Sequence, residues 1–214
     1  MKNHRYIVVE GPIGCGKTSL ATRLAQRLGA ATLLEDPKAN PFLPLFYKDM
    51  RRHALPTQLF FLFQRVQQLE GLRQPDLFGK SYVADFALSK DPLFARLTLD
   101  DAEYQLYMQI YGHVKPQASD PDLVIYLQAS TDDLLRRLRE RERADESGLP
   151  IPSTAYLREL NEAYQHFFFH YSATPLLVVD TSHAEFHTSD RALDDLIRQI
   201  RTMGRGTMYY VPRG

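Results

Sequence analysis

The segment Gly11-Pro12-Ile13-Gly14-Cys15-Gly16-Lys17-Thr18 decides the fold of this chain, because it matches the pattern GxxxxGK[ST] in full. An apolar run, Tyr6–Val9, comes directly before it, and a stretch with helical spacing, Thr18–Leu28, follows it. A strand, a glycine-rich loop and a helix in this order are typical of a loop that binds nucleoside triphosphates.

Each part of this loop has a task in binding a triphosphate. The glycines let backbone N–H groups face the phosphates, and the following helix directs its positive end at them. Lys17 would neutralise the β- and γ-phosphates, and Thr18 would offer its hydroxyl to Mg²⁺. Cys15 is expected to fill space in the loop rather than to react. The loop therefore predicts that the chain binds ATP together with Mg²⁺.

Strands and helices alternate along the chain, which predicts an α/β fold with right-handed crossovers. Short runs rich in Val, Ile and Leu predict five buried parallel strands, at Tyr6–Val9, Ala31–Leu34, Tyr82–Ala84, Leu123–Leu127 and Leu176–Val179. Helical spacing predicts helices at Thr18–Leu28, Pro41–Leu72, Asp100–His113, Asp132–Arg143, Ser153–Tyr171 and Asp190–Met203. Ser130 and Ser189 are expected to cap two of these helices.

Length and composition limit the kinds of protein this can be. The 214 residues suit a single domain over 1–214, with a tail of uncertain order at 204–214. A single cysteine excludes an internal disulfide, and equal numbers of Lys plus Arg and of Asp plus Glu, 26 each, give no sign of a nucleic acid partner. No apolar run near the start approaches the length of a membrane span, so we expect a cytoplasmic protein without a membrane partner.

Two carboxylates close predicted strands, and ligands of parallel sheets collect at the carboxyl ends of the strands. Glu35 follows the second run and Asp85 follows the third. Phosphoryl transfer to a hydroxyl needs a metal that bridges phosphates and a carboxylate that accepts the hydroxyl proton. We expect Glu35 to be the base and Asp85 to join Thr18 in holding the Mg²⁺ ion. Both could instead cap the next helix; Asp36 is a spare base and Asp180 a weaker candidate.

The segment 136–143 carries five arginines in eight residues of a chain that has no net charge. It could be a solvated helix in which Arg and Glu pair three or four residues apart. Beside a phosphate loop, we expect it to be part of a lid, about 136–150, that closes over the triphosphate and stabilises charge during transfer.

Taken together, these motifs resemble the deoxynucleoside kinase family, and most closely its bacterial purine-handling branch. The resemblance runs from about residue 5 to 180. It rests on Glu10–Thr18, on Glu35-Asp36-Pro37, on Phe46-Tyr47-Lys48-Asp49 with Leu55-Pro56-Thr57-Gln58, and on the lid 139–147. It implies a P-loop kinase fold and an enzyme that uses ATP and Mg²⁺ to phosphorylate the 5′-hydroxyl of a deoxyadenosine, a deoxyguanosine or a deoxycytidine in nucleotide salvage.

The resemblance also implies roles for single residues. Glu35 would be the general base and Gln58 would bind the edge of the nucleobase. Tyr47 and Glu146 would hold the 3′-hydroxyl, and Asp91 matches a position that influences base choice. The lid residues Arg141 and Arg143 would reach the phosphates. The family also tends to form homodimers through helices, which the apolar helices with Phe60, Phe61 and Phe63 or with Phe167, Phe168 and Phe169 would suit.

The chain departs from the family pattern after the third strand. Relatives usually carry an acidic residue and an arginine there, whereas this chain has Asp85 and Phe86. Lys90 or Arg96 could supply the missing charge. Two other functions stay open at this point: a thymidylate or other nucleoside monophosphate kinase, and a nucleotide-dependent switch that hydrolyses ATP slowly without an acceptor.

Overall fold

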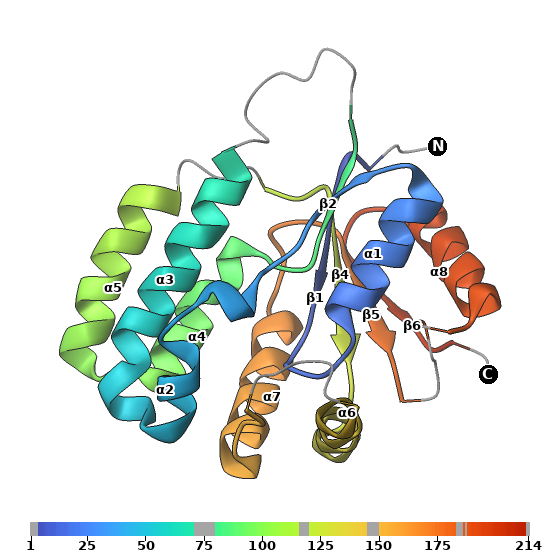
Figure 1. Cartoon of the computed structure of the whole chain (residues 1–214). Coiled ribbons are helices and arrows are strands. Elements are labelled where there is room, and N and C mark those ends of the chain that lie inside the picture. The colour runs from blue at the N-terminus through green and yellow to red at the C-terminus, as the bar shows by residue number, and fades with distance from the viewer. Residues whose placement is uncertain are drawn as a thin grey trace.

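The computed structural model describes residues 4–70, 80–115, 120–144, 150–182, 186 and 188–212. Within these ranges a parallel sheet of six strands, in the order β2-β3-β1-β4-β5-β6, forms the centre of the molecule (Figure 1). The strands are β1 Tyr6–Glu10, β2 Ala31–Leu33, β3 Tyr82–Ala84, β4 Leu123–Gln128, β5 Leu176–Asp180 and β6 Thr207–Tyr210.

Helices connect the strands. The α-helices are α1 Lys17–Leu28, α2 Leu43–Lys48, α3 Met50–Glu70, α4 Asp91–Thr98, α5 Asp101–Val114, α6 Thr131–Arg143, α7 Thr154–Phe169 and α8 Asp190–Thr202. Two short 3₁₀ helices, η1 Pro37–Ala39 and η3 Leu88–Lys90, follow β2 and β3. Both lie at the carboxyl ends of the strands, where ligands of parallel sheets bind.

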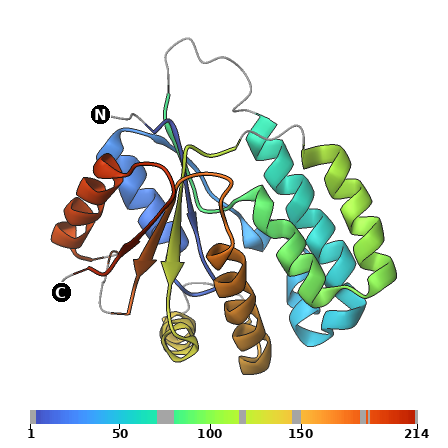
Figure 2. The ribbon, with the colours of Figure 1, turned by 180° about the vertical axis from the view of Figure 1, so that it is seen from behind.

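The alternation of side chains along the strands divides the core into two layers. Ile7 and Val9 of β1 pack with α1 and α8, while Tyr6 and Val8 pack with the core on the opposite face. Helices α3, α4, α5 and α7 cover that opposite face, as the front and back views show (Figures 1 and 2). Helix α6 lies at the carboxyl ends of the strands, on the same side as the glycine-rich loop (Figure 1).

The caps expected from the sequence are confirmed. The hydroxyl of Ser130 accepts a hydrogen bond from the backbone N–H of Asp133, and Ser189 accepts one from Ala192. Asp100 and Glu103 form a reciprocal capping box at the start of α5. Gly29, at φ 65°, ends α1 in the left-handed conformation that favours glycine.

The α/β class and the parallel sheet are confirmed, while several elements differ from the prediction. The sheet has a sixth strand, β6, inside the tail, because four residues of alternating exposure pair with the edge of β5. The long helix predicted over 41–72 is two helices, and the chain breaks at Asp49, whose backbone leaves the helical region at φ −143°. Helix α4 was not predicted.

None of the helices in the described ranges is long and apolar enough to cross a membrane.

Candidate active site

A cavity of about 790 Å³ lies at the carboxyl ends of the strands. Residues distant in sequence line it: the loop and first turn of α1, the ends of β2 and β3, one face of α3, and α6 with the residues around it. Residues 13–18 of the phosphate loop face this one space together with Glu35, Tyr47, Gln58, Asp85 and Arg141. The cavity therefore joins most of the residues that the sequence singled out.

The glycine-rich loop is folded as a phosphate loop. Its Lys17 ammonium donates to the carbonyls of Gly11 and Pro12, at 2.9 and 3.2 Å. A side chain at Gly14, where φ is 88°, would lie 2.9 Å from Leu138 of α6, so glycine is required there. Residues 13–18 line the cavity, whereas Gly11 and Pro12 shape the loop from behind and are not in its wall. Burial raises the pKa of the Cys15 thiol, as suits an inert filling residue.

Asp85 connects the phosphate loop to Glu35. One of its carboxylate oxygens accepts the hydroxyl of Thr18 at 2.5 Å, and the other accepts the backbone N–H of Glu35 at 2.8 Å. Burial raises the pKa of Asp85, and the two hydrogen bonds oppose this rise. One carboxylate thus fixes the Thr18 hydroxyl and the backbone of the expected base relative to each other.

Glu35 faces a buried cation that sequence analysis did not identify. The guanidinium of Arg65 on α3 donates to Glu35 through Nε at 2.7 Å and forms an ion pair with it. Its other side pairs with Asp91 at 2.5 Å. Burial alone would raise the pKa of Glu35, but Arg65 first and Lys90 second lower it to about 2. Glu35 is therefore a charged carboxylate at neutral pH, ready to accept a hydrogen bond.

One face of α3 forms the wall opposite the phosphate loop. Gln58, Phe61 and Arg65 lie three and four residues apart, so all three point the same way and line the cavity. The Gln58 amide donates weakly to the Thr98 hydroxyl at 3.4 Å, which leaves its oxygen for another partner. Tyr47, at the end of α2, packs edge-on against Phe46 and also lines the cavity, and burial raises its pKa to about 12. An amide, a guanidinium and a phenol therefore face one ligand space.

Helix α6 presents arginines both to the cavity and to a separate shallow groove, and Arg136 lines both of them. Arg137 and Arg141, one turn apart, line the cavity, and Arg137 donates to the carbonyl and hydroxyl of Thr181 after β5. Arg139 and Arg143 line the groove on the other side of the helix. Arg143, expected at the phosphates, is thus turned away from the cavity because it lies two residues, about 200°, beyond Arg141.

The structure places the remaining predicted residues as follows. Asp91 is fully buried and does not line the cavity, so it can act on a ligand only through Arg65. Glu146 lies outside the described residues. Phe86, which stands where relatives usually carry an arginine, is buried in the core. Of the two cations considered as replacements, Lys90 lines the cavity, whereas Arg96 is exposed and pairs with Asp101.

Arg65 could have been found from the sequence by its spacing. It lies seven residues after Gln58, which puts the two side chains on one face of a helix. A charged residue on the same face as Phe61, in an otherwise apolar stretch, indicates a ligand wall or a buried pair. What the sequence could not provide is the partner, since Glu35 and Asp91 are 30 and 26 residues away.

The residues present fit a Mg²⁺ ion bound largely by phosphates. The Thr18 hydroxyl and the Asp85 carboxylate are oxygen donors, the ligand type that Mg²⁺ prefers, and they meet at the cavity wall. No three His, Cys, Asp or Glu side chains group as metal ligands in the described part of the chain. A magnesium ion that keeps its waters and substrate phosphates needs only one or two protein ligands.

Comparisons with a family model and with individual proteins agree on one family. A family model described as deoxynucleoside kinase matches residues 7–204. A deoxyadenosine kinase of Lactobacillus acidophilus is 30% identical over 205 residues, covering 91% of this chain and 94% of that protein. A deoxyguanosine kinase of Bacillus subtilis is 34% identical over 166 residues, covering 77% of this chain and 79% of that protein.

Solved structures agree on the fold. A deoxyadenosine kinase from M. mycoides, determined with the products dCMP and a flexible dCDP bound, superposes with a TM-score of 0.78. It is 24% identical in sequence, and the match covers 92% of this chain and all of the other. The same enzyme with bound dATP gives a TM-score of 0.75.

Proposed function

This chain belongs to the deoxynucleoside kinase family, and on that premise we propose that it transfers the γ-phosphoryl group of ATP to the 5′-hydroxyl of a purine deoxynucleoside. The observation that carries the proposal is the single cavity in which the phosphate loop, Glu35 and Gln58 meet. The family assignment favours this reaction over the two alternatives left open by the sequence, the monophosphate kinase and the acceptor-free switch.

The purine preference is supported by the wall formed by α3. A side-chain amide can donate to and accept from adjacent groups, as amides do with adenine, and a guanidinium can donate to the paired acceptors of guanine. Gln58 offers such an amide, and Arg65, on the same face of α3, offers the N–H groups that its pairs with Glu35 and Asp91 leave free. Five of the relatives most similar to this chain are kinases named for deoxyadenosine or deoxyguanosine, one of them also for deoxycytidine.

In the proposed reaction the nucleoside lies along α3 with its 5′-hydroxyl at Glu35. Glu35 accepts the hydroxyl proton, the 5′-oxygen forms a bond to the γ-phosphorus, and the bond from that phosphorus to the β,γ-bridging oxygen breaks, with its electron pair leaving on ADP. Positioning and charge stabilisation dominate such transfers, so a carboxylate of low pKa suffices if Asp85 holds it in place.

The remaining groups have supporting roles. Lys17 and the loop amides bind the triphosphate, and Arg137 and Arg141 cover it from α6. Thr18 and Asp85 would hold Mg²⁺, which supplies positive charge between the phosphate oxygens when bound. Tyr47 would hold the 3′-hydroxyl and crowd a 2′-hydroxyl, which disfavours ribonucleosides, and Glu146 remains its predicted partner.

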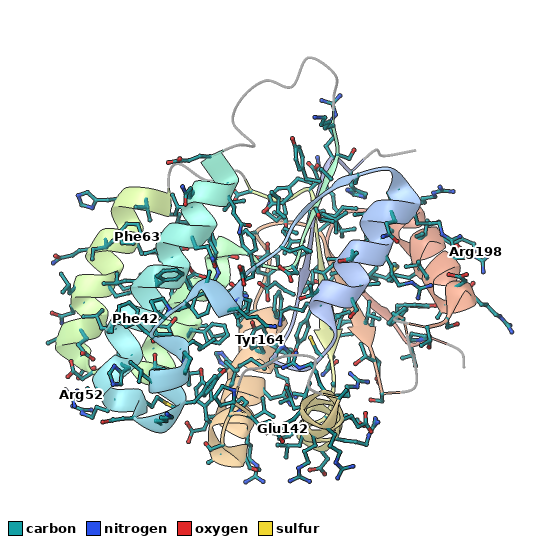
Figure 3. The ribbon with its side chains drawn as sticks, viewed as in Figure 1. Phe42, Arg52, Phe63, Glu142, Tyr164 and Arg198 are labelled. Carbon is teal, nitrogen blue, oxygen red and sulfur yellow. The ribbon has the colours of Figure 1, made fainter. Side chains whose placement is uncertain are left out.

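We further propose that the protein is a homodimer that works in nucleotide salvage in the cytoplasm. Two apolar side chains, Phe63 on α3 and Leu106 on α5, are about half exposed, at 52 and 48%. They lie on helices that pack side by side at one edge of the molecule, where Figure 3 labels Phe63. Exposed apolar groups on neighbouring helices suit a helix-to-helix interface.

The test is ADP release from ATP and Mg²⁺ with different acceptors. Each of the four deoxynucleosides, the matching ribonucleosides and thymidine monophosphate are supplied separately. The proposal expects the highest kcat/KM with deoxyadenosine or deoxyguanosine, and little activity with the ribonucleosides. Activity confined to the monophosphate, or slow hydrolysis that no acceptor accelerates, would contradict it.

A further inference from the structure

Lys90 is a buried cation in the wall of the cavity. It ends the 3₁₀ helix η3, and its side chain is only 2% exposed. Its ammonium lies 3.0 Å from a carboxylate oxygen of Glu10 and 5.6 Å from the centre of the Phe94 ring. A buried ammonium is unfavourable unless a partner compensates it, so the position of Lys90 is specified by the residues around it.

Glu10 holds this ammonium in a fixed place relative to the phosphate loop. It ends β1, is fully buried, and directly precedes Gly11. Besides the ion pair, its carboxylate accepts the backbone N–H groups of Gly11 at 3.0 Å and Ala87 at 2.6 Å, and the Tyr164 hydroxyl at 3.2 Å. Figure 3 shows Tyr164 in the interior, beside the sheet. Four partners from three segments of the chain therefore leave this carboxylate little freedom to move.

The cations of the inner cavity are not equally engaged. Lys17 donates to two loop carbonyls, and Arg65 pairs with both Glu35 and Asp91. Within the described residues, the ammonium of Lys90 forms an ion pair with one carboxylate, that of Glu10, although an ammonium has three N–H donors. Lys90 lines the cavity, so its remaining donors are available to a ligand in that space.

The charge of Lys90 also acts on the base. Lys90 is, after Arg65, the strongest of the cations that lower the pKa of Glu35. Lys90 and Glu35 line the same cavity, and Glu10 ties the Lys90 ammonium to the root of the phosphate loop. That is the region through which a phosphoryl group passes from donor to acceptor.

We propose that Lys90 is a catalytic residue whose ammonium binds the oxygens of the phosphoryl group as it moves to the acceptor, and that Glu10 is the residue that positions it. This inference rests on the proposed phosphoryl transfer. Negative charge spreads over the equatorial oxygens of the moving group, and a cation already fixed in a dry site stabilises that charge without reorganisation. The bonds made and broken are those of the transfer itself, and Lys90 keeps its proton throughout.

The first experiment replaces Lys90 by methionine, which keeps an unbranched side chain, one atom shorter, and removes the charge. We expect Lys90→Met to lower kcat about 100-fold, the usual effect of removing one preorganised donor, while the dissociation constant for ATP changes little. Arg96→Met is the matched control, since Arg96 is an exposed cation on the next helix and does not line the cavity. It should turn over like the wild type.

A double variant separates catalysis from structure. Lys90→Met leaves the Glu10 carboxylate buried without its cation, which lowers stability. Adding Glu10→Gln removes that unpaired charge, so the thermal unfolding midpoint should rise again while kcat stays low. If kcat instead returns together with stability, Lys90 is only a counter-ion and the proposal is wrong.

A third variant keeps the proposal testable if the methionine variants do not fold. Glu10→Gln alone leaves the Lys90 cation in place but removes one carboxylate oxygen that fixes it, so kcat should fall by about tenfold with ATP binding retained. Unchanged kcat in this variant would contradict a positioning role. A wild-type protein that phosphorylates no deoxynucleoside would refute the proposed function. An active wild type whose Lys90 variants are equally active would refute only the role of Lys90.

Discussion

At the scale of single residues, the site depends on carboxylates that each make more than one contact. Asp85 joins the Thr18 hydroxyl to the backbone of Glu35, Glu10 joins the phosphate loop to Lys90, and Glu35 itself faces Arg65. Groups held by several partners lose little freedom when substrate binds, so they are already arranged for the reaction.

Glu35→Gln tests the base. The amide keeps the size and one acceptor oxygen but cannot take the proton, so kcat should fall about 100-fold or more while ATP still binds.

Arg65 and Lys90 hold the pKa of Glu35 at about 2, below the ordinary value for a glutamate, so the carboxylate stays charged as the pH falls through 4. The wild-type rate should therefore show no loss from Glu35 protonation above about pH 4.

The matched control is the neighbouring Asp36→Asn. Asp36 caps the short helix η1 by accepting the backbone N–H groups of Lys38 and Ala39, a contact that an asparagine oxygen can keep. Steady-state rates and an ATP binding measurement on both variants decide between the two carboxylates. A large loss of kcat in Asp36→Asn, with Glu35→Gln unaffected, would move the base to Asp36.

How far these residues could be predicted depends on where their signals lie. Lys17, Thr18, Glu35 and Asp85 follow from local patterns, because a loop motif and the ends of two strands identify them. The partners of Arg65 and the pair of Glu10 with Lys90 depend on contacts across 26 to 80 residues, which no local pattern contains. The sequence could not decide whether Lys90 or Arg96 replaces the arginine of the relatives, and only the burial of Lys90 and the exposure of Arg96 decide this.

At the scale of elements, the errors of prediction have a common physical cause. Apolar spacing is almost continuous over 41–72, so it does not mark the break at Asp49 that separates α2 from α3. Helix α4 is only eight residues long and starts directly after η3, too short for a clear periodic signal. Strand β6 pairs along only one edge, and its residues alternate in exposure without an apolar run. The short strands β2 and β3 were found from their apolar runs, whereas the break at Asp49, α4 and β6 have no clear signal of their own.

Helix α6 provides a test at this scale, because its two faces carry the same residue type. Arg141 lines the cavity and Arg139 lines the outer groove. Arg141→Gln should lower kcat about tenfold or more at saturating ATP, since the transferring phosphoryl loses a cation. Arg139→Gln, a matched change on the outer side, should leave kcat unchanged.

The measurement is a pair of initial-rate titrations with ATP at a fixed, saturating deoxynucleoside concentration. Circular dichroism on both variants checks that α6 remains helical, as expected because neither residue caps it. Equal losses in the two variants would mean that the arginines act together as a charged surface rather than through the face that lines the cavity.

At the scale of the whole molecule, the cavity is a property of the assembled fold. The sheet brings the loop after β1 together with residues after β2 and β3. Helices from other parts of the chain, among them α3 and α6, complete the cavity. The helix of the substrate wall, α3, precedes β3 in the chain, and the helix of the lid, α6, follows β4, and these two strands lie on opposite sides of β1 in the sheet. The α/β fold with its phosphate loop was predictable from one motif and the alternation of elements, whereas the shape of the cavity was not.

The edge formed by α3 and α5 carries the last prediction. Phe63 and Leu106 are exposed there, and α3 is also the helix that carries Gln58 and Arg65 on its inner face. A partner packed on the outer face would restrain the inner one, so a dimer would stabilise the base-binding wall.

Light scattering at micromolar concentration should give twice the chain mass of 24.7 kDa for the wild type. Phe63→Glu combined with Leu106→Glu should give the monomer mass, because two charges are placed in an apolar contact. Phe169→Glu, on an exposed aromatic at the end of α7, is the control and should stay dimeric. A monomeric wild type would exclude the dimer, and dissociation by Phe169→Glu alone would move the interface to α7.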